Sequence, residues 1–154
     1  MRKILLYILF LSAALILPQK DVDVGKLIPV ELIQLDRKEN LIVLSTDAGI
    51  SGIGESVEAA AENMHDTTAG VVFLDTADFL VVAESAKQDI ETIKEYLKPS
   101  VRLCALNAGV DLKEAAAFLG VHKPHCRLRD WEDGLELELL TNENGRLILK
   151  NEKI

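Results

Sequence analysis

The glycine-rich segment 49–54 (GISGIG) stands where a phosphate-binding loop would stand, between a predicted strand and a predicted helix. The free N–H groups of a helix N-terminus attract anions. However, the spacing matches neither G-x-G-x-x-G nor a loop ending in G-K-[ST], and Glu55 and Glu58 bring negative charge to the first helical turn. We therefore interpret the segment as a structural turn whose glycines allow positive φ, with ligand contact through Gly52 and Gly54 as the alternative.

The segment 122–126 (HKPHC) contains side chains that bind zinc. His122, His125 and Cys126 lie close together in sequence, and Cys104 falls on a predicted strand. Imidazole and thiolate are suitable zinc donors, but the Lys-Pro pair between the histidines excludes a regular helix and the spacing shows no complete ligand set. We predict a surface loop, with no metal and no other cofactor. A disulfide between the cysteines is left open, since the apolar neighbours of Cys104 are typical of a small buried residue.

Carboxylates gather near the predicted strand ends, where binding and catalytic sites of α/β proteins often lie. Asp75 and Asp78 are kept as candidates for ligand or partner contact, although a chain with 25 acidic residues forms such clusters without function. Trp131, among acidic neighbours, is a candidate partner anchor, with a place at the edge of the core as the alternative. Neither a G-x-S-x-G elbow nor an H-E-x-x-H motif occurs, so we expect no catalytic residues.

Length and charge narrow the choice of function. A chain of 154 residues that is 49% hydrophobic has the material for one domain with a core. Its formal net charge of −8 repels phosphate backbones, so nucleic acid is not an expected partner.

Residues 1–20 are predicted to be a signal peptide or a membrane anchor. Arg2 and Lys3 precede an apolar run from Ile4 to Leu17 that only Ser12 interrupts. As a helix this run spans ~21 Å, less than the ~30 Å hydrocarbon core, so an export signal fits better than a lone span; whether the segment is cleaved is left open. The basic start places the N-terminus in the cytoplasm, so the remaining chain is expected to be exported and to stay associated with the membrane.

Periodicity in the remaining chain predicts a mixed β-sheet packed with about three helices, an α/β domain over 27–154, with α+β as the alternative. Val57, Ala60, Ala61 and Met64 form one apolar helical face, expected to pack on strands around Val43, Val72, Val81 and Leu103. Helix starts are predicted from the capping pairs Ser85–Gln88 and Asp111–Glu114, and the first of these helices is expected to continue to Lys98 and Pro99. The strands are predicted at 27–36, 41–46, 71–74, 79–83, 101–106, 135–140 and 146–150. The first and last pairs are expected to form hairpins, and the runs 71–74 and 79–83 a strand pair or one strand with a tight turn.

The middle of the chain, roughly Leu27 to Leu119, resembles the N-terminal domain of the Ger(x)C family, the membrane-anchored C subunits of spore germinant receptors. The resemblance rests on a glycine turn followed by a helix with a Glu-Ala pair, on an apolar strand ending in an acid, on an aromatic-leucine helix end before an arginine-containing strand, and on a short helix ending in leucine. These features are Gly54, Ser56, Glu58 and Ala59; Glu84 and Ala86 in FLVVAESA; Tyr96, Leu97 and Arg102 in EYLKPSVRLCAL; and Ala115 to Leu119.

The resemblance implies a non-enzymatic, extracytoplasmic binding or assembly domain whose partners are membrane receptor subunits. It supplies no catalytic residues. Family members carry a lipobox cysteine after the leader, where this chain has Pro18, Gln19 and Lys20, so the family's lipid attachment is not carried over. A small exported hydrolase and a small-ligand-sensing domain are the alternative functions.

Overall fold

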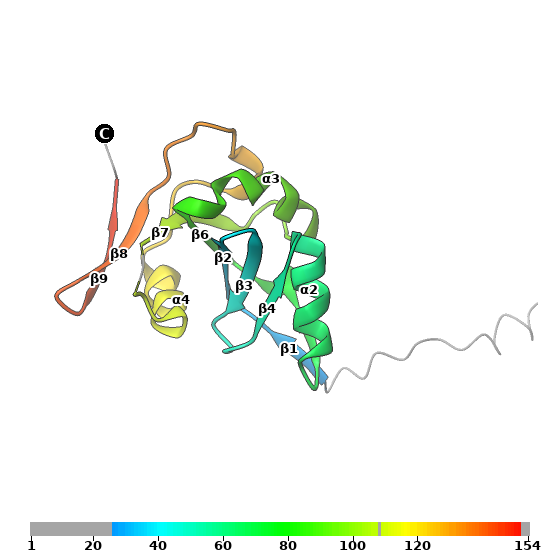
Figure 1. Cartoon of the computed structure of the whole chain (residues 1–154). Coiled ribbons are helices and arrows are strands. Elements are labelled where there is room, and N and C mark those ends of the chain that lie inside the picture. Colours follow the sequence, from blue (N-terminus) through cyan, green and yellow to red (C-terminus); the bar gives the residue numbers. More distant parts are fainter. Residues whose placement is uncertain (1–25, 108, 152–154) are drawn as a thin grey trace, which may run out of the picture.

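The computed structural model describes residues 26–107 and 109–151, and the predicted leader at 1–20 lies outside them. A seven-stranded mixed sheet forms the centre, in the order β4-β3-β2-β6-β7-β8-β9 (Figure 1). Strands β2, β6, β7 and β8 are parallel, whereas β3, β4 and β9 run antiparallel to their neighbours. The strands are β2 (Leu32–Lys38), β3 (Leu41–Thr46), β4 (Ser51–Gly54), β6 (Phe79–Ala83), β7 (Arg102–Leu106), β8 (Leu139–Glu143) and β9 (Arg146–Lys150). The expected mixed α/β architecture is confirmed.

A second, two-stranded sheet pairs β1 (Leu27–Pro29) with β5 (Val71–Phe73) in parallel. The strand predicted over 27–36 is therefore broken at buried Val30, and each part joins a different sheet. Likewise, the two runs at 71–74 and 79–83 do not pair with each other, because β5 lies beside β1 and β6 lies between β2 and β7. Apolar composition predicts a strand but does not choose its neighbour.

Within residues 26–107 and 109–151, three α-helices accompany the sheets: α2 (Val57–Asp66), α3 (Ile90–Ile93) and α4 (Leu112–Val121). The predicted cap of α4 is confirmed, since the Asp111 carboxylate accepts a hydrogen bond from the Glu114 N–H at 2.9 Å. Ser56 caps α2 in the same way, accepting from the Ala59 N–H at 3.1 Å. Both helices therefore begin at a side chain that satisfies one of their free amides.

The capping box predicted at Ser85 is wrong, and α3 is shorter than expected because 3-10 turns precede and follow it at Glu84–Asp89 and Lys94–Tyr96. Ser85 donates to the Asp36 carboxylate on β2 instead, at 3.1 Å. The next turn is held to β2 by two bonds between Arg37 and Asp89, of 2.9 and 2.6 Å. These contacts with the sheet override the local helix signal.

The core has two layers, one on each face of the sheet. Helices α2 and α3 share one buried cluster with Ile42, Leu44 and Leu80, among others. Helix α4 packs on the opposite face, against apolar residues of β2, β6, β7 and β8. The predicted inner face of α2 (Val57, Ala60, Ala61 and Met64) is confirmed as buried.

All four strands expected beneath α2 contribute to its cluster, but only two of the four residues named for them do. Val72 and Leu103 do belong to the α2 cluster. Val81 belongs to the α4 cluster, and Val43 is only half-buried on the face that α2 does not cover. Side chains alternate between faces along a strand, so a shift of one position reverses the side.

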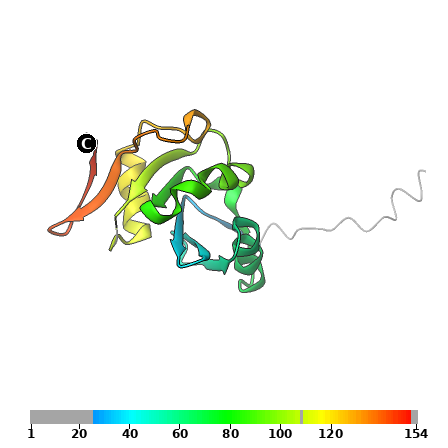
Figure 2. The same ribbon diagram turned by 45° about the horizontal axis from the view of Figure 1, so that its top comes forward.

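The C-terminal hairpin is confirmed, although its first strand begins at Leu139 and not at residue 135. Asn144 and Gly145 both have positive φ, 54° and 79°, which is the two-residue turn that matches strand twist. In both views this hairpin lies at the margin of the sheet beside α4 (Figures 1 and 2).

Candidate functional site

Gly52 and Gly54 lie in strand β4, not in a turn, and their φ values are not positive. The residue type is explained by close packing: a Cβ on Gly52 would lie 2.7 Å from the Met64 nitrogen and closer still to the Ala60 carbonyl oxygen, and one on Gly54 would lie 2.5 Å from the Ala60 nitrogen. Both glycines therefore let α2 approach the strand. Of the segment's glycines, Gly49 alone has the predicted positive φ, at 77°.

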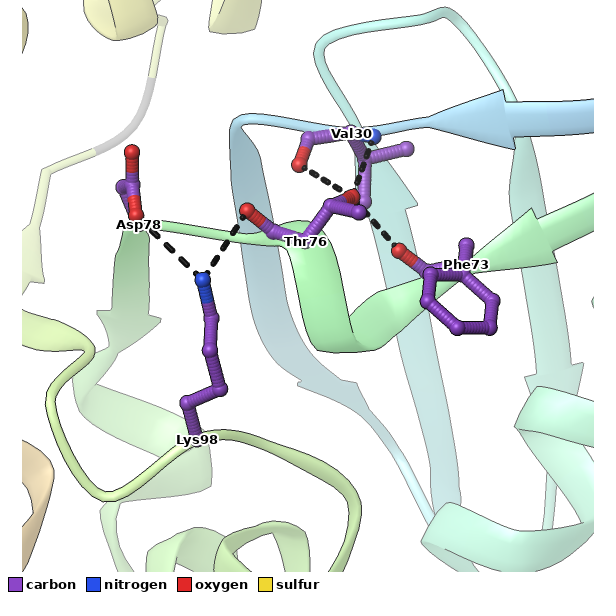
Figure 3. Close-up of polar contacts among 5 residues, drawn as sticks. All are labelled: Val30, Phe73, Thr76, Asp78 and Lys98. Carbon is purple, nitrogen blue, oxygen red and sulfur yellow. Dashed lines mark hydrogen bonds and ion pairs between the residues drawn. The ribbon is translucent and has the colours of Figure 1, made fainter.

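Asp75 and Asp78 lie in the connection between β5 and β6, and both side chains are exposed. Asp78 forms an ion pair with Lys98 at 3.5 Å, and the same Lys98 ammonium donates to the Thr76 carbonyl at 3.4 Å (Figure 3). Among the described residues, Asp78 but not Asp75 thus forms a charged contact with another segment.

Thr76 holds this connection in place through its hydroxyl. The hydroxyl accepts from the Val30 N–H at 3.0 Å and lies 3.0 Å from the Val30 carbonyl and 2.7 Å from the Phe73 carbonyl (Figure 3). A hydroxyl has one proton, which suits the shorter contact to Phe73. The polar groups beside Asp78 therefore join the small sheet to the large one.

Trp131 lies inside the protein. Its side chain is 5% exposed and belongs to the α2 and α3 cluster, while its carbonyl accepts from Lys94 at 3.0 Å. A partner cannot reach the indole without opening the core, so the alternative, a place in the core, is the correct interpretation.

The loop after α4 brings His125 to Glu138, which sequence spacing did not indicate. The carboxylate accepts from the His125 N–H at 2.6 Å and lies 3.0 Å from Nδ1 of the ring. His125 is 89% exposed on its side chain and Glu138 only 13%. With Cys126 and Asp130 these residues line a hollow of about 610 Å³. Within the described residues, no group of three or more His, Cys, Asp or Glu side chains is arranged to hold a metal ion.

Both thiols are free, and their surroundings favour the protonated form. Burial raises the pKa of Cys104 to about 12. Burial also raises the pKa of Cys126, with Asp130 and Glu138 adding to the rise and Lys94 opposing it. Because the thiolate is the nucleophile, Cys126 beside His125 is not an activated pair.

A larger hollow of about 760 Å³ lies between the β3–β4 turn and the start of α4. Three of its polar groups are already engaged: the Thr46 hydroxyl with the Ile50 backbone, the Asp47 carboxylate with the Glu31 and Leu32 amides, and the Asp111 carboxylate with α4. They hold loops together and do not converge on the hollow.

On the face of β3 and β4 away from α2, three aliphatic side chains lie open beside the serine pair Ser45 and Ser51, a feature that sequence reasoning did not single out. Val43 and Ile53 are paired across the two strands, and Leu41 lies on the same face. Ile53 is 50% exposed and Leu41 is 41% exposed. The segment LIVLST could have indicated this surface, because its first four residues are all apolar. A strand with one solvated face would carry polar residues at alternate positions.

Comparison of this chain with family models, with curated proteins and with solved structures found no match. In the part of the chain that the structure describes, no helix is long and apolar enough to cross a membrane.

Proposed function

We propose that this protein is a membrane-associated, extracytoplasmic domain that acts by binding and assembly and not by catalysis. Its partners are membrane receptor subunits, as the resemblance to the Ger(x)C family implies. The leader pattern at 1–20 supports export. The net charge of −8 argues against nucleic acid as a partner.

The observation that carries the proposal is the open apolar face of β3 and β4. Leu41, Val43 and Ile53 present adjoining aliphatic side chains on one side of an antiparallel pair, while their neighbours Ile42 and Leu44 are buried beneath α2. An apolar surface that remains after the core is complete is typical of a protein contact. Such contacts have an apolar centre and a polar rim, and here the charged Asp36 and Lys38 of β2 lie opposite Val43 and Leu41.

The chemistry of the other candidate residues supports binding over catalysis. The Cys126 thiol has a raised pKa, three of the polar groups around the larger hollow hold loops, and Asp78 is paired with Lys98. A hydrolase needs a nucleophile or base directed at a common point in a pocket.

Site-specific photo-crosslinking in cells tests the proposal. With the full chain, a photoreactive residue replacing Ile53 is expected to crosslink to a membrane protein. The matched control replaces Glu62, which is exposed on α2, and is expected to give no such product. Equal crosslinking from both positions, or a full-length protein found only in the cytosol, would contradict the proposal.

A further inference from the structure

The two edges of the large sheet differ in how their backbone groups are satisfied. At the β4 edge, the Ile53 N–H, which points away from β3, donates to the Asn63 side chain of α2 at 3.0 Å. At the other edge, β9 is the outermost strand and no described helix covers it (Figures 1 and 2). The first edge is protected by a helix, and the second is available for pairing.

The register of the hairpin identifies the free groups on β9. Glu143 and Arg146 flank the two-residue turn and are hydrogen-bonded to each other, so the bonded pairs alternate from there. Leu140 lies opposite Leu149, and its carbonyl accepts from Asn107 beyond β7 at 3.0 Å, so it faces away from β9. The N–H and C=O groups of Leu147 and Leu149 therefore point outward, without a partner among the described residues.

The side chains beside this edge carry positive charge on an otherwise acidic protein. Arg146 and Lys150 are exposed at the two ends of β9, with half-buried Ile148 between them on the same face. Lys150 is paired with Glu143, whereas Arg146 has no ion pair within the described residues. The formal charge of the whole chain is −8, whereas β9 carries two basic side chains and no acidic one.

We propose that β9 binds an extended segment of a partner protein, which adds an antiparallel strand to the sheet. The segment places carboxylates opposite Arg146 and Lys150 and an apolar residue opposite Ile148, an acid-x-apolar-x-acid pattern. Backbone bonds to Leu147 and Leu149 supply affinity, and the charged pairs select the segment. This inference goes beyond the proposed function, since it depends neither on the leader nor on the open face of β3 and β4.

Charge also disfavours a second copy of this chain as the occupant in the register centred on Ile148. In a two-fold pairing of β9 strands centred on Ile148, Leu147 and Leu149 of the two copies would form the bonded pairs. Arg146 of each copy would then lie opposite Lys150 of the other. Two pairs of like charges directly opposite each other are destabilising, so the edge favours an acidic segment over itself.

Blocked synthetic peptides test the pairing with the full chain in detergent micelles. The peptide SETVTES has the proposed pattern, and SKTVTKS reverses its charges. N-methylation of both threonine amides removes the donors that would face β9, while N-methylation of the valine amide alters a group that faces away. By fluorescence anisotropy, SETVTES and its valine-methylated form are expected to bind roughly tenfold or more tightly than the other two peptides.

Two protein variants locate the binding site. Arg146→Glu is expected to reverse the preference between SETVTES and SKTVTKS. Arg129→Glu makes the same change in net charge at an exposed arginine outside the sheet and is expected to leave the preference intact. Amide chemical shifts of Leu147 and Leu149 should move on addition of SETVTES.

Three results would overturn the proposal. The first is no saturable binding of SETVTES at millimolar concentration, and the second is equal binding of the threonine-methylated peptide, which would reduce the effect to general electrostatic attraction. The third is a dimer in sedimentation experiments that SETVTES dissociates, because the occupant of the edge would then be a second copy.

Discussion

Strands β6 and β7 and strands β3 and β4 belong to one sheet but are buried differently. Four of the five residues of β6 and four of those of β7 are buried, because α2 and α3 cover one face and α4 covers the other. In β3 the buried residues alternate with half-buried and exposed ones, because α2 covers one face only.

The difference follows from strand direction. Parallel strands need long crossover connections, and the helices in those connections cover both faces of the sheet. Antiparallel β3 and β4 are joined by the short turn at 47–50, which brings no helix to the second face. The two-sided region is therefore the stable centre, and the one-sided region is where surface chemistry remains available for binding.

The largest difference in stability is expected when one valine from each region is replaced by aspartate. Val81 is fully buried in β6, so Val81→Asp is expected to cost at least ~4 kcal/mol of unfolding free energy, since an unpaired carboxylate would be buried. Val43→Asp, on the open face, is expected to cost about 1 kcal/mol. Urea denaturation measures both, and similar losses would show that the β3 face is covered after all.

Gly52→Ala tests the contact that covers the inner face of β4. The added methyl group meets the backbone of α2 at Ala60 and Met64, which cannot move aside as a side chain can, so a loss of about 3 kcal/mol is expected. Gly120→Ala is the control, because nothing lies within 4 Å of its Cβ position and alanine favours the helix by about 0.5 kcal/mol. Thermal melts of the two variants should shift in opposite directions.

Because Cys104 is buried in the two-sided region, the stability of the protein should decrease at alkaline pH. Burial raises the pKa of the Cys104 thiol from 9.0 to about 12, so above pH 9 the unfolded chain loses a proton that the folded protein keeps. The contribution of the buried thiol to the free energy of unfolding is therefore complete well below pH 9 and is lost as the pH rises toward 12. Between pH 9 and pH 10 the wild type should lose about 1 kcal/mol more stability than Cys104→Ala, because the unfolded thiol is already half deprotonated at pH 9. Parallel pH profiles in denaturant titrations would contradict this burial.

Ile53→Thr is expected to have the smallest effect on stability, within ~0.5 kcal/mol, because the side chain is half-exposed and threonine retains strand propensity. The same variant removes apolar surface from the open face and should weaken crosslinking from a photoreactive residue placed at Val43. A large loss of stability would mean that Ile53 is a core residue and not part of a contact surface.

Local signals in the sequence predicted much of the fold. The C-terminal hairpin, the Asp111 cap of α4 and the apolar face of α2 depend on neighbours within a few residues, and all three are confirmed, although the turn is at 144–145 and not over 141–145. The mixed sheet followed from the alternation of strand and helix patterns.

For the proposed site residues, the sequence drew attention to the positions but did not predict what their side chains do. Gly52 and Gly54 proved to be packing positions, Trp131 a core residue and Asp78 a partner of Lys98. Each role depends on a residue at least six positions away along the chain, which local spacing does not encode. The pairing of His125 with Glu138 was missed for the same reason.

The sequence by itself determined most of the strands and the start of α4, because hydrophobic period and caps act within a few residues. Only the tertiary structure decided which side of each strand faces which helix. In LIVLST and FLVVA both sets of alternate residues are apolar, so the pattern cannot distinguish Val43 from Leu44, or Val81 from Val82. The helix that arrives on each face makes that choice. It buries Leu44 beneath α2 and Val81 beneath α4, and it leaves Val43 on the open face.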